Sequence, residues 1–457
     1  MSIEPIGAIT LVLGLLCLFL DYRVTLVALV FTTVFGAAAA LFLGAANIPP
    51  GHVFLGVAMI VTLTRRRAAA AFLRALHPDR PGFWLACMVV YGIATAFLYP
   101  RVMAGLTQIV PLGSSGFDNT GSTVPLGPVS SNFTQSVYMV ANLMCFALVA
   151  ALASSADGFR AALAGVIAYA LGNTVFAVLD LATYVTGTSA LMDFMRNARY
   201  ALHTDTEISG LKRIVGAFTE ASSFARSSLG VLGVTGTLWL CGYRPRLTGF
   251  LALASFGLIV LSTSSTGLAG IPVAVGLLYL TALWRCGTSA RAFNSTVLVL
   301  SLPFLTAFVV LAALLHPQTS AMIQTYVDTV VLSKMQTDSG VERSSWNAVA
   351  MANFLDTGGL GVGLGTIRTS SLATALLAGG GLIGTLLYAV FFGAAFLVNP
   401  GPKGSLARDV RTAARNGCLC LVAGDLLISS TIDQGLFFYV LAAIASARPA
   451  LPEEATA

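Results

Sequence analysis

The chain has 457 residues, of which 56% are hydrophobic and only 10% are charged. The charged residues collect between apolar runs of about 15–25 residues, the length that crosses a bilayer core. This pattern excludes a soluble protein and predicts a polytopic membrane protein, in which an ionisable group inside a span needs a function or a partner.

The apolar runs predict an all-α bundle of twelve to fourteen transmembrane helices. Helices are favoured over barrel strands because strands would alternate over about 10 residues. We find no internal repeat and no soluble part large enough to fold alone, so residues 1–457 are expected to form one integral membrane domain. The thirteen candidate spans are 5–20, 24–46, 50–64, 82–100, 134–153, 159–187, 224–241, 247–261, 267–284, 294–315, 371–398, 412–430 and 433–447.

The basic residues predict the orientation, because cytoplasmic loops are enriched in Lys and Arg. Basic residues concentrate in segments 65–80 and 399–415, and thirteen spans place both segments on one face. We predict that this face is cytoplasmic and that the N-terminus lies outside. The net charge of +6 then reflects topology and contact with anionic membrane lipids, not nucleic-acid binding.

Three predicted outer segments are long, and long connections in compact proteins are usually functional or disordered. Segment 101–133 is rich in Gly, Ser and Pro and is expected to be a flexible loop. Segment 188–223 contains apolar residues at helical spacing over 191–202, which predicts a helix on the outer membrane surface, or a re-entrant or loop-covering helix. Segment 316–370 is the large outer loop region and carries the most chemically varied side chains.

The stretch 212–228 combines basic and acidic residues next to a span. If it is helical, Arg213 and Glu220 lie on one face about two turns apart. Guanidinium groups suit phosphate oxygens, and a carboxylate suits proton transfer. Arg226 falls inside an otherwise apolar run, so it is either a ligand-binding residue or the structural partner of an intramembrane carboxylate such as Asp180 or Asp425.

Two further motifs lie on the predicted outer face. Arg343 and Trp346 are one helical turn apart, which fits either an anionic or sugar ligand or a cation–π contact that holds the loop. Ser370 and Ser371 are followed by nine residues, then Gly381, then two residues and Gly384. We expect Arg213, Glu220, Arg343 and Ser370 to converge, with Arg368 as a further phosphate-binding candidate. The dispersed histidines and the cysteine spacing predict neither a metal site nor disulfide bonds.

The order of these motifs resembles the bacterial O-antigen polymerase/ligase superfamily, which includes Wzy-like polymerases and WaaL-like ligases. The ligase pattern of His, a polar residue, nine residues and two glycines is similar to the stretch from Ser370, with Ser370 in place of the histidine. The family's Arg–Gly–Phe–Glu–Pro–Ser stretch is similar to the segment from Arg213 to Ser222, with Ala221 in place of proline. The Ser/Thr-rich turn at 261–267 and the Arg343–Trp346 pair complete the resemblance.

The resemblance implies a GT-C-like glycosyltransferase of the bacterial inner membrane with its site facing the periplasm. It would polymerise oligosaccharide repeat units carried on polyprenyl diphosphate, with inversion and without a metal or other cofactor. Glu220 would be the base, and Arg213 and Arg343 would stabilise the leaving diphosphate. Substrate binding would involve Arg226, Trp346, Arg368, Ser370 and Ser371.

The resemblance also implies further partners, namely the flippase and the chain-length regulator of the same pathway. Three alternatives remain open. An O-antigen ligase would transfer the finished glycan to a lipid acceptor, although Ser370 replaces the family histidine. A polysaccharide or lipid-linked sugar transporter would use intramembrane carboxylates, but transporters often show internal repeats. A scaffold would not need Arg, Glu and Trp clustered on one face.

Overall fold

The computed structural model describes residues 2–43, 46–117, 123–199, 202–204, 206–208, 211–289, 292–328, 337–397 and 401–449, which are largely helical. The helices are α1 (Pro5–Phe19), α2 (Tyr22–Thr32), α3 (Pro50–Leu63), α4 (Arg66–Ala75), α5 (Pro81–Val102), α6 (Ser131–Leu152), α7 (Ala156–Val185), η1 (Ser189–Met195), α8 (Ala221–Leu240), α9 (Pro245–Leu261), α10 (Ser265–Cys286), α11 (Phe293–Leu315), α12 (Pro317–Val327), α13 (Asp338–Asp356), α14 (Leu372–Ala375), η4 (Leu376–Gly380), α15 (Gly381–Phe396), α16 (Leu406–Ile428) and α17 (Gly435–Ser446). The strands are β1 (Ser2–Ile3), β2 (Leu41–Leu43), β3 (Ala46–Ile48), β4 (Gln108–Ile109), β5 (Val124–Pro125), β6 (Glu207–Ile208) and β7 (Leu211–Lys212).

Six helical stretches of the described chain are long and apolar enough to cross a membrane. They are α5, α6, α7, α10, α11 and the continuous Leu372–Phe396 stretch that α14, η4 and α15 form together. Five shorter apolar helices, α1, α2, α3, α9 and α17, accompany them. The expectation of a largely helical membrane protein is therefore confirmed.

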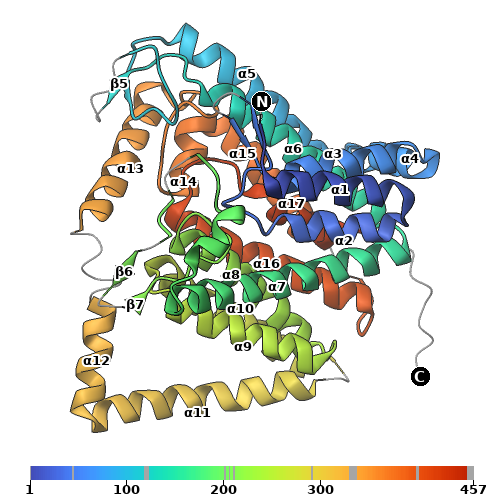
Figure 1. The fold of residues 1–457 in the computed structure, drawn as a ribbon, viewed down its shortest axis with the longest axis vertical. Helices are drawn as coiled ribbons and strands as arrows, with labels where there is room; N and C mark the ends of the chain where they lie inside the picture. Colours follow the sequence, from blue (N-terminus) through green and yellow to red (C-terminus); the bar gives the residue numbers. More distant parts are fainter. Residues whose placement is uncertain are drawn as a thin grey trace.

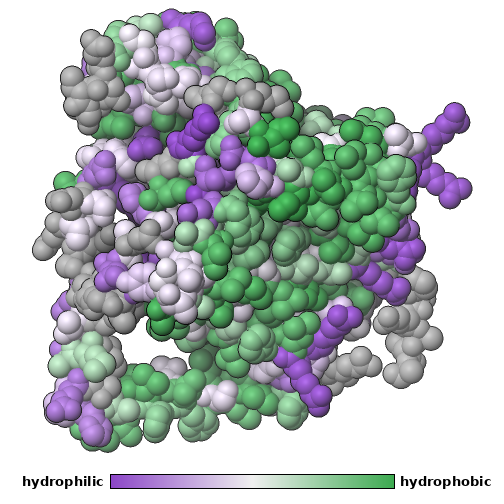
Figure 2. Space-filling view, in the orientation of Figure 1, coloured by the Kyte–Doolittle hydropathy of each residue, from purple (hydrophilic) through white to green (hydrophobic). Residues whose placement is uncertain are grey.

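Apolar and polar side chains gather on different parts of the surface (Figure 2). Hydrophobic side chains cover α1, α2 and the neighbouring middle of the molecule, and hydrophilic side chains gather towards its left and right edges (Figure 2). Near the left edge lie α13 and the β6–β7 hairpin, and near the right edge lies α4 (Figure 1). This arrangement is the one that a bilayer imposes on a helical bundle.

The centre of the bundle is formed by α8, α16 and α17 (Figure 1). Every residue of α17 from Leu436 to Ala445 is at most 6% exposed, because this helix is apolar on all sides and is enclosed by its neighbours. Phe437 of α17 stacks on Tyr169 of α7, with ring centroids 3.6 Å apart. The central helices therefore pack against the middle of α7.

The predicted span 24–46 is wrong beyond its first half. Helix α2 ends at Thr32, and the chain then turns and enters strand β2. Residues Ala37 to Ala40 are fully buried in this non-helical stretch. Non-helical backbone inside a membrane is tolerated only where protein covers it. Ala38 packs with Met192 and Met195 of η1 and with Phe176 of α7.

The predicted surface helix 191–202 is also shorter than expected, with residues 200 and 201 outside the described part. The regular structure is the 3₁₀ helix η1, which ends at Met195. Met192 and Met195 of this helix are buried against Ile6 and Ala217. Arg196, the residue after η1, turns inward and donates hydrogen bonds of 2.9 and 2.6 Å to the Gly216 carbonyl oxygen.

The described residues of segment 101–133 are folded, contrary to the expected flexible loop. Strands β4 and β5 pair antiparallel, and Pro111 forms a β-bridge with Ile367. The large region 316–370 contains α12 and α13, and residues 329–336 lie outside the described part. Thr107 donates a 2.6 Å hydrogen bond to Asp356, and Asn353 donates one of 2.6 Å to the carbonyl oxygen of Gln108. The first loop thereby anchors the C-terminal end of α13.

Candidate functional site

The candidate site lies where the chain enters α8, and a buried carboxylate shapes this entry. The Asp180 side chain accepts hydrogen bonds from the backbone N–H groups of Val215 and Gly216, at 2.7 and 3.0 Å. Arg196 forms a 2.7 Å salt bridge with the other carboxylate oxygen, and Lys212 lies 3.7 Å from it. Gly216 adopts a φ of +59°, which favours glycine at this turn. Asp180 is therefore a positioning residue for the loop.

Residues 213–220 are not helical, so the expected shared helical face of Arg213 and Glu220 is wrong. Glu220 is extended and precedes the first residue of α8. Its carboxylate oxygen Oε1 accepts a short hydrogen bond from the Ser222 hydroxyl. The turn at Gly216, rather than helical spacing, sets the position of Arg213 relative to Glu220.

The structure brings Glu220 and Arg343 together across 123 residues of chain. The Arg343 guanidinium nitrogen lies 3.5 Å from Glu220 Oε2, and the two side chains are 28% and 30% exposed. Arg343 belongs to α13, so this contact joins the outer region to the start of α8. Because both side chains are partly exposed, a ligand has access to them.

Arg213 belongs to the same electrostatic cluster. Burial lowers the pKa of the Arg213 guanidinium from its ordinary value; the nearby Glu220 carboxylate raises it, and the nearby Arg343 lowers it. Arginine remains protonated at neutral pH under such shifts. The Nε of Arg213 is a buried donor without a hydrogen-bond partner among the described residues. Two guanidinium groups and one carboxylate leave a positive charge that an anionic ligand would neutralise.

An aromatic side chain lies beside this cluster on α13. The guanidinium carbon of Arg368 lies 5.0 Å from the centre of the Trp346 ring, within the range of a cation–π contact. Trp346 follows Arg343 by three residues, which places both on neighbouring parts of one helical face. Arg368 is exposed, so its terminal nitrogens also face solvent.

The serine motif, which we define as Ser370, Ser371, Gly381 and Gly384, is linked to α13 by Asn347. The sequence did not identify Asn347 as a site residue. The Asn347 side-chain oxygen accepts 2.8 Å hydrogen bonds from the Ser370 backbone N–H and from the Thr374 hydroxyl. Ser371 is the residue before α14, and its carbonyl oxygen accepts from Thr374. These hydrogen bonds hold α13 against α14. The sequence signal for Asn347 was only that a polar residue directly follows Trp346.

Close contacts explain why the two glycines of this motif have no side chain. Gly381 has a φ of +64°, and a Cβ there would lie 2.0 Å from the carbonyl oxygen of Leu360. A Cβ on Gly384 would lie 3.3 Å from Tyr91. The glycine-rich segment before α14 therefore packs closely against the start of α15, and a larger residue at position 381 would displace its backbone.

Arg226 is not joined to this cluster by any interaction among the described residues. It forms a two-bond salt bridge with Asp425, with both distances 2.7 Å, and donates a 2.9 Å bond to the Gln434 carbonyl oxygen. Asp425 also accepts from the Gln434 side chain at 3.1 Å. The side chains of Arg226 and Asp425 are 17% and 5% exposed. Of the two interpretations of Arg226, this arrangement matches the structural pair.

The Ser/Thr-rich turn lies against the first turns of α8. Ser262, Thr263 and Ser264 are at most 2% exposed, and a Cβ on Gly267 would lie 3.1 Å from Ala225. Ser262 and Thr263 use their hydroxyls on backbone carbonyls of the same turn. Among the described residues, no group of three His, Cys, Asp or Glu side chains is arranged to hold a metal ion. All seven cysteines are free.

Comparison with known proteins adds no assignment to this geometry. No protein-family model, no curated protein and no solved structure matches the chain.

Proposed function

We propose that this protein is a membrane glycosyltransferase that polymerises oligosaccharide repeat units carried on polyprenyl diphosphate. The proposal places it in the bacterial inner membrane as a GT-C-like bundle of twelve to fourteen spans, with the candidate site on the periplasmic face. It rests on the motif resemblance and on the side-chain cluster at the start of α8.

The contact between Glu220 and Arg343 is the observation that carries the proposal. A glycosyl transfer from a lipid diphosphate needs a base for the acceptor hydroxyl and a cation for the departing phosphate oxygens. These two residues supply the two groups within 3.5 Å of each other, and they come from distant parts of the chain. Arg213 adds a second guanidinium with an unused buried donor.

In the proposed reaction the acceptor hydroxyl attacks the anomeric carbon of the donor sugar. A carbon–oxygen bond forms to the acceptor while the bond between the anomeric carbon and the phosphate oxygen breaks, which inverts the configuration. Glu220 takes the hydroxyl proton, and polyprenyl diphosphate leaves with the electron pair. Arg213 and Arg343 stabilise the charge that develops on the diphosphate.

The weak geometry of the Glu220–Arg343 contact fits this reaction. Its single 3.5 Å distance contrasts with the two 2.7 Å bonds of the buried Arg226–Asp425 pair. A diphosphate offers Arg343 several anionic oxygens and competes with one carboxylate oxygen. Substrate binding would draw Arg343 towards phosphate and free Glu220 to accept the proton.

Trp346 and Arg368 would bind the donor sugar and its phosphate. An aromatic face accommodates the apolar face of a sugar ring, and Arg368 lies over the same ring at 5.0 Å. Ser370 and Ser371 would contribute indirectly, since Asn347 ties this segment to α13. Arg226 would stabilise the bundle rather than bind substrate.

The lipid-linked material of cells that lack this protein tests the proposal. Accumulation of single repeat units on polyprenyl diphosphate is the expected result for a polymerase. Accumulation of full-length polymer on the lipid carrier would indicate a ligase instead. Repeat units confined to the cytoplasmic leaflet would indicate a transporter and would contradict the assignment.

A further inference from the structure

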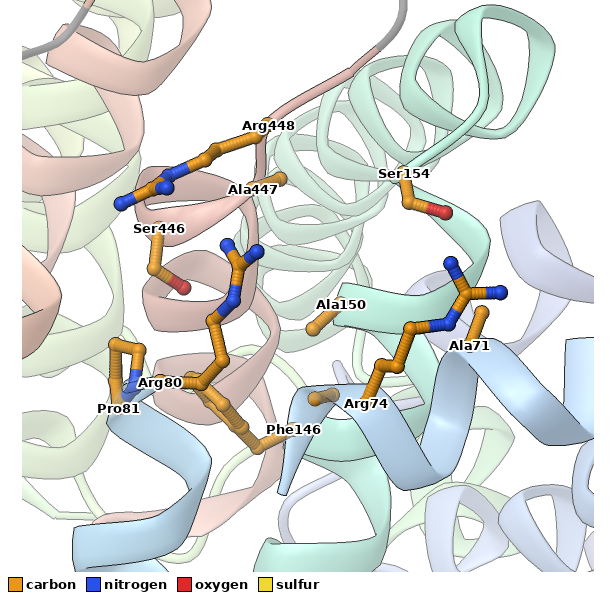
Figure 3. Close-up of a pocket in the computed structure, with 11 residues that line it drawn as sticks. Ala71, Arg74, Arg80, Pro81, Phe146, Ala150, Ser154, Ser446, Ala447 and Arg448 are labelled. Carbon is orange, nitrogen blue, oxygen red and sulfur yellow. The ribbon is translucent and has the colours of Figure 1, made fainter. Parts of the chain in front are cut away.

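A basic pocket lies away from the candidate site, with a volume of about 320 Å³ (Figure 3). Three arginines from separate parts of the chain line it: Arg74 on α4, Arg80 just before α5, and Arg448 just after α17. Phe146 and Ala150 of α6 supply apolar lining. The pocket therefore combines cationic groups with an apolar wall.

The pocket lies at one end of α6, and the segment that leads to Arg368 lies at the other end. Helix α6 begins beside the segment that leads to Arg368, where Asn132 donates a 2.8 Å hydrogen bond to the Leu364 carbonyl oxygen. Its other end reaches the pocket, which Ser154 also lines just beyond that end. A helix of 22 residues is about 33 Å long at 1.5 Å per residue. That length matches the thickness of a bilayer core.

The guanidinium groups of the pocket are not neutralised by its lining, which contains no carboxylate. Arg74 uses its Nε for a 3.3 Å bond to the Ala70 carbonyl oxygen, and Arg80 uses its Nε for a 3.4 Å contact with exposed Asp79. The salt bridges among the described residues include neither Arg74 nor Arg448. The terminal nitrogens of Arg74 and Arg80 remain for a ligand.

Three arginine side chains from separate parts of the chain border the cavity. Arg74 and Arg80 extend in the same direction from the ends of α4 and α5, and Arg80 points towards the segment of Ser446 and Arg448 (Figure 3). Like charges that border one cavity repel one another, and an anion bound between them reduces this repulsion. A tetrahedral anion with several oxygens suits guanidinium groups that border one cavity from separate parts of the chain.

We propose that this pocket binds the phosphate group of an anionic phospholipid, with phosphatidylglycerol as the representative headgroup. A membrane lipid is favoured over a free phosphate by the surroundings of the pocket. Helix α4 is amphipathic, with Leu73 68% exposed beside Arg74, as expected of a helix lying at a membrane surface. Basic pockets between membrane helices at the cytoplasmic side are suited to phospholipid headgroups. Phe146 and Ala150 would contact the glycerol part of the lipid.

The test uses the purified full-length protein and two double variants, each of which loses two positive charges. R74Q/R80Q removes two pocket guanidinium groups, and R66Q/R67Q removes two exposed arginines from the same α4 helix that do not line the pocket. Binding of dioctanoyl phosphatidylglycerol, dioctanoyl phosphatidylcholine and inorganic phosphate is measured by thermal-shift titration and native mass spectrometry. R448Q, altered beyond the end of α17, is a third variant that requires no change in helix packing.

We expect saturable binding of one phosphatidylglycerol, weakened about tenfold or more in R74Q/R80Q, because charge-assisted hydrogen bonds are lost. R66Q/R67Q should bind as the unaltered protein does, and R448Q should be intermediate. Equal weakening in both double variants would indicate diffuse attraction to charge and overturn the proposal. Saturable binding of inorganic phosphate without phosphatidylglycerol would also overturn it, since the pocket would then serve a free anion. If R74Q/R80Q does not fold, full affinity in R448Q overturns the assignment.

Discussion

Replacing Arg226 by leucine should strongly destabilise the bundle. The change removes both 2.7 Å bonds to Asp425, which is 5% exposed, and among the described residues the Gln434 side chain remains as the hydrogen-bond partner of that carboxylate. Loss of one member of a buried ion pair costs about 3–5 kcal/mol, because the other charge remains buried and unpaired. The double variant R226L/D425L should recover most of this loss, since two apolar side chains replace the pair without leaving a charge.

The assay is equilibrium unfolding of the purified protein in mixed micelles, and it measures the free energy of unfolding. The control is R23L, which breaks a 3.4 Å salt bridge with Asp157 between side chains about half exposed. An exposed pair contributes about 0–1 kcal/mol, so R23L should have little effect. If R226L destabilises no more than R23L, the structural interpretation of Arg226 is refuted, and its guanidinium would again be a candidate for substrate binding.

Three further outcomes are expected. Glu220→Gln should lower kcat by about 10²–10⁴-fold while lipid-linked substrate still binds, because an amide cannot accept the proton; wild-type turnover would remove Glu220 as the base. Arg343→Lys should restore little of the activity lost in Arg343→Ala, because a point charge does not reproduce the planar fork; full rescue in a polymer assay would contradict this. Gly381→Ala should lower the melting temperature, since its Cβ would lie 2.0 Å from the Leu360 carbonyl oxygen, whereas Gly276→Ala in open space on α10 should leave it unchanged or raised.

Apolar run length predicted the helices well where a span is regular. The runs at 82–100 and 134–153 correspond to α5 and α6. The run at 24–46 failed because hydropathy reports burial and not backbone conformation: Ala37 to Ala40 are buried by neighbouring protein without being helical. Local composition likewise suggested a flexible loop over 101–133, whereas pairing with distant Ile367 gives part of it a fixed structure.

The candidate residues were visible in the sequence, but their arrangement was not. Glu220 was unusual as a charged side chain at the edge of an apolar run, and Arg343 was unusual as an outer-loop arginine one turn from Trp346. Their contact depends on how α13 docks onto the bundle. In that docking Asn353 donates a hydrogen bond to the Gln108 carbonyl oxygen, and Asn347 accepts one from the Ser370 backbone N–H. Asp180 is similar: its sequence position marked it as functional or structural, and its bonds to the loop before α8 come from the fold.

The most direct test of the central claim is the length of the glycan on polyprenyl diphosphate in cells that carry Arg343→Ala. The variant protein must be present in the membrane at the wild-type level, and Arg101→Ala is the matched control, since Arg101 is exposed at the end of α5 and bonds to its own helix at Phe97. We predict single repeat units in Arg343→Ala cells and normal polymer in Arg101→Ala cells. Normal polymer in Arg343→Ala cells would contradict the assignment of this cluster as the site of glycosyl transfer.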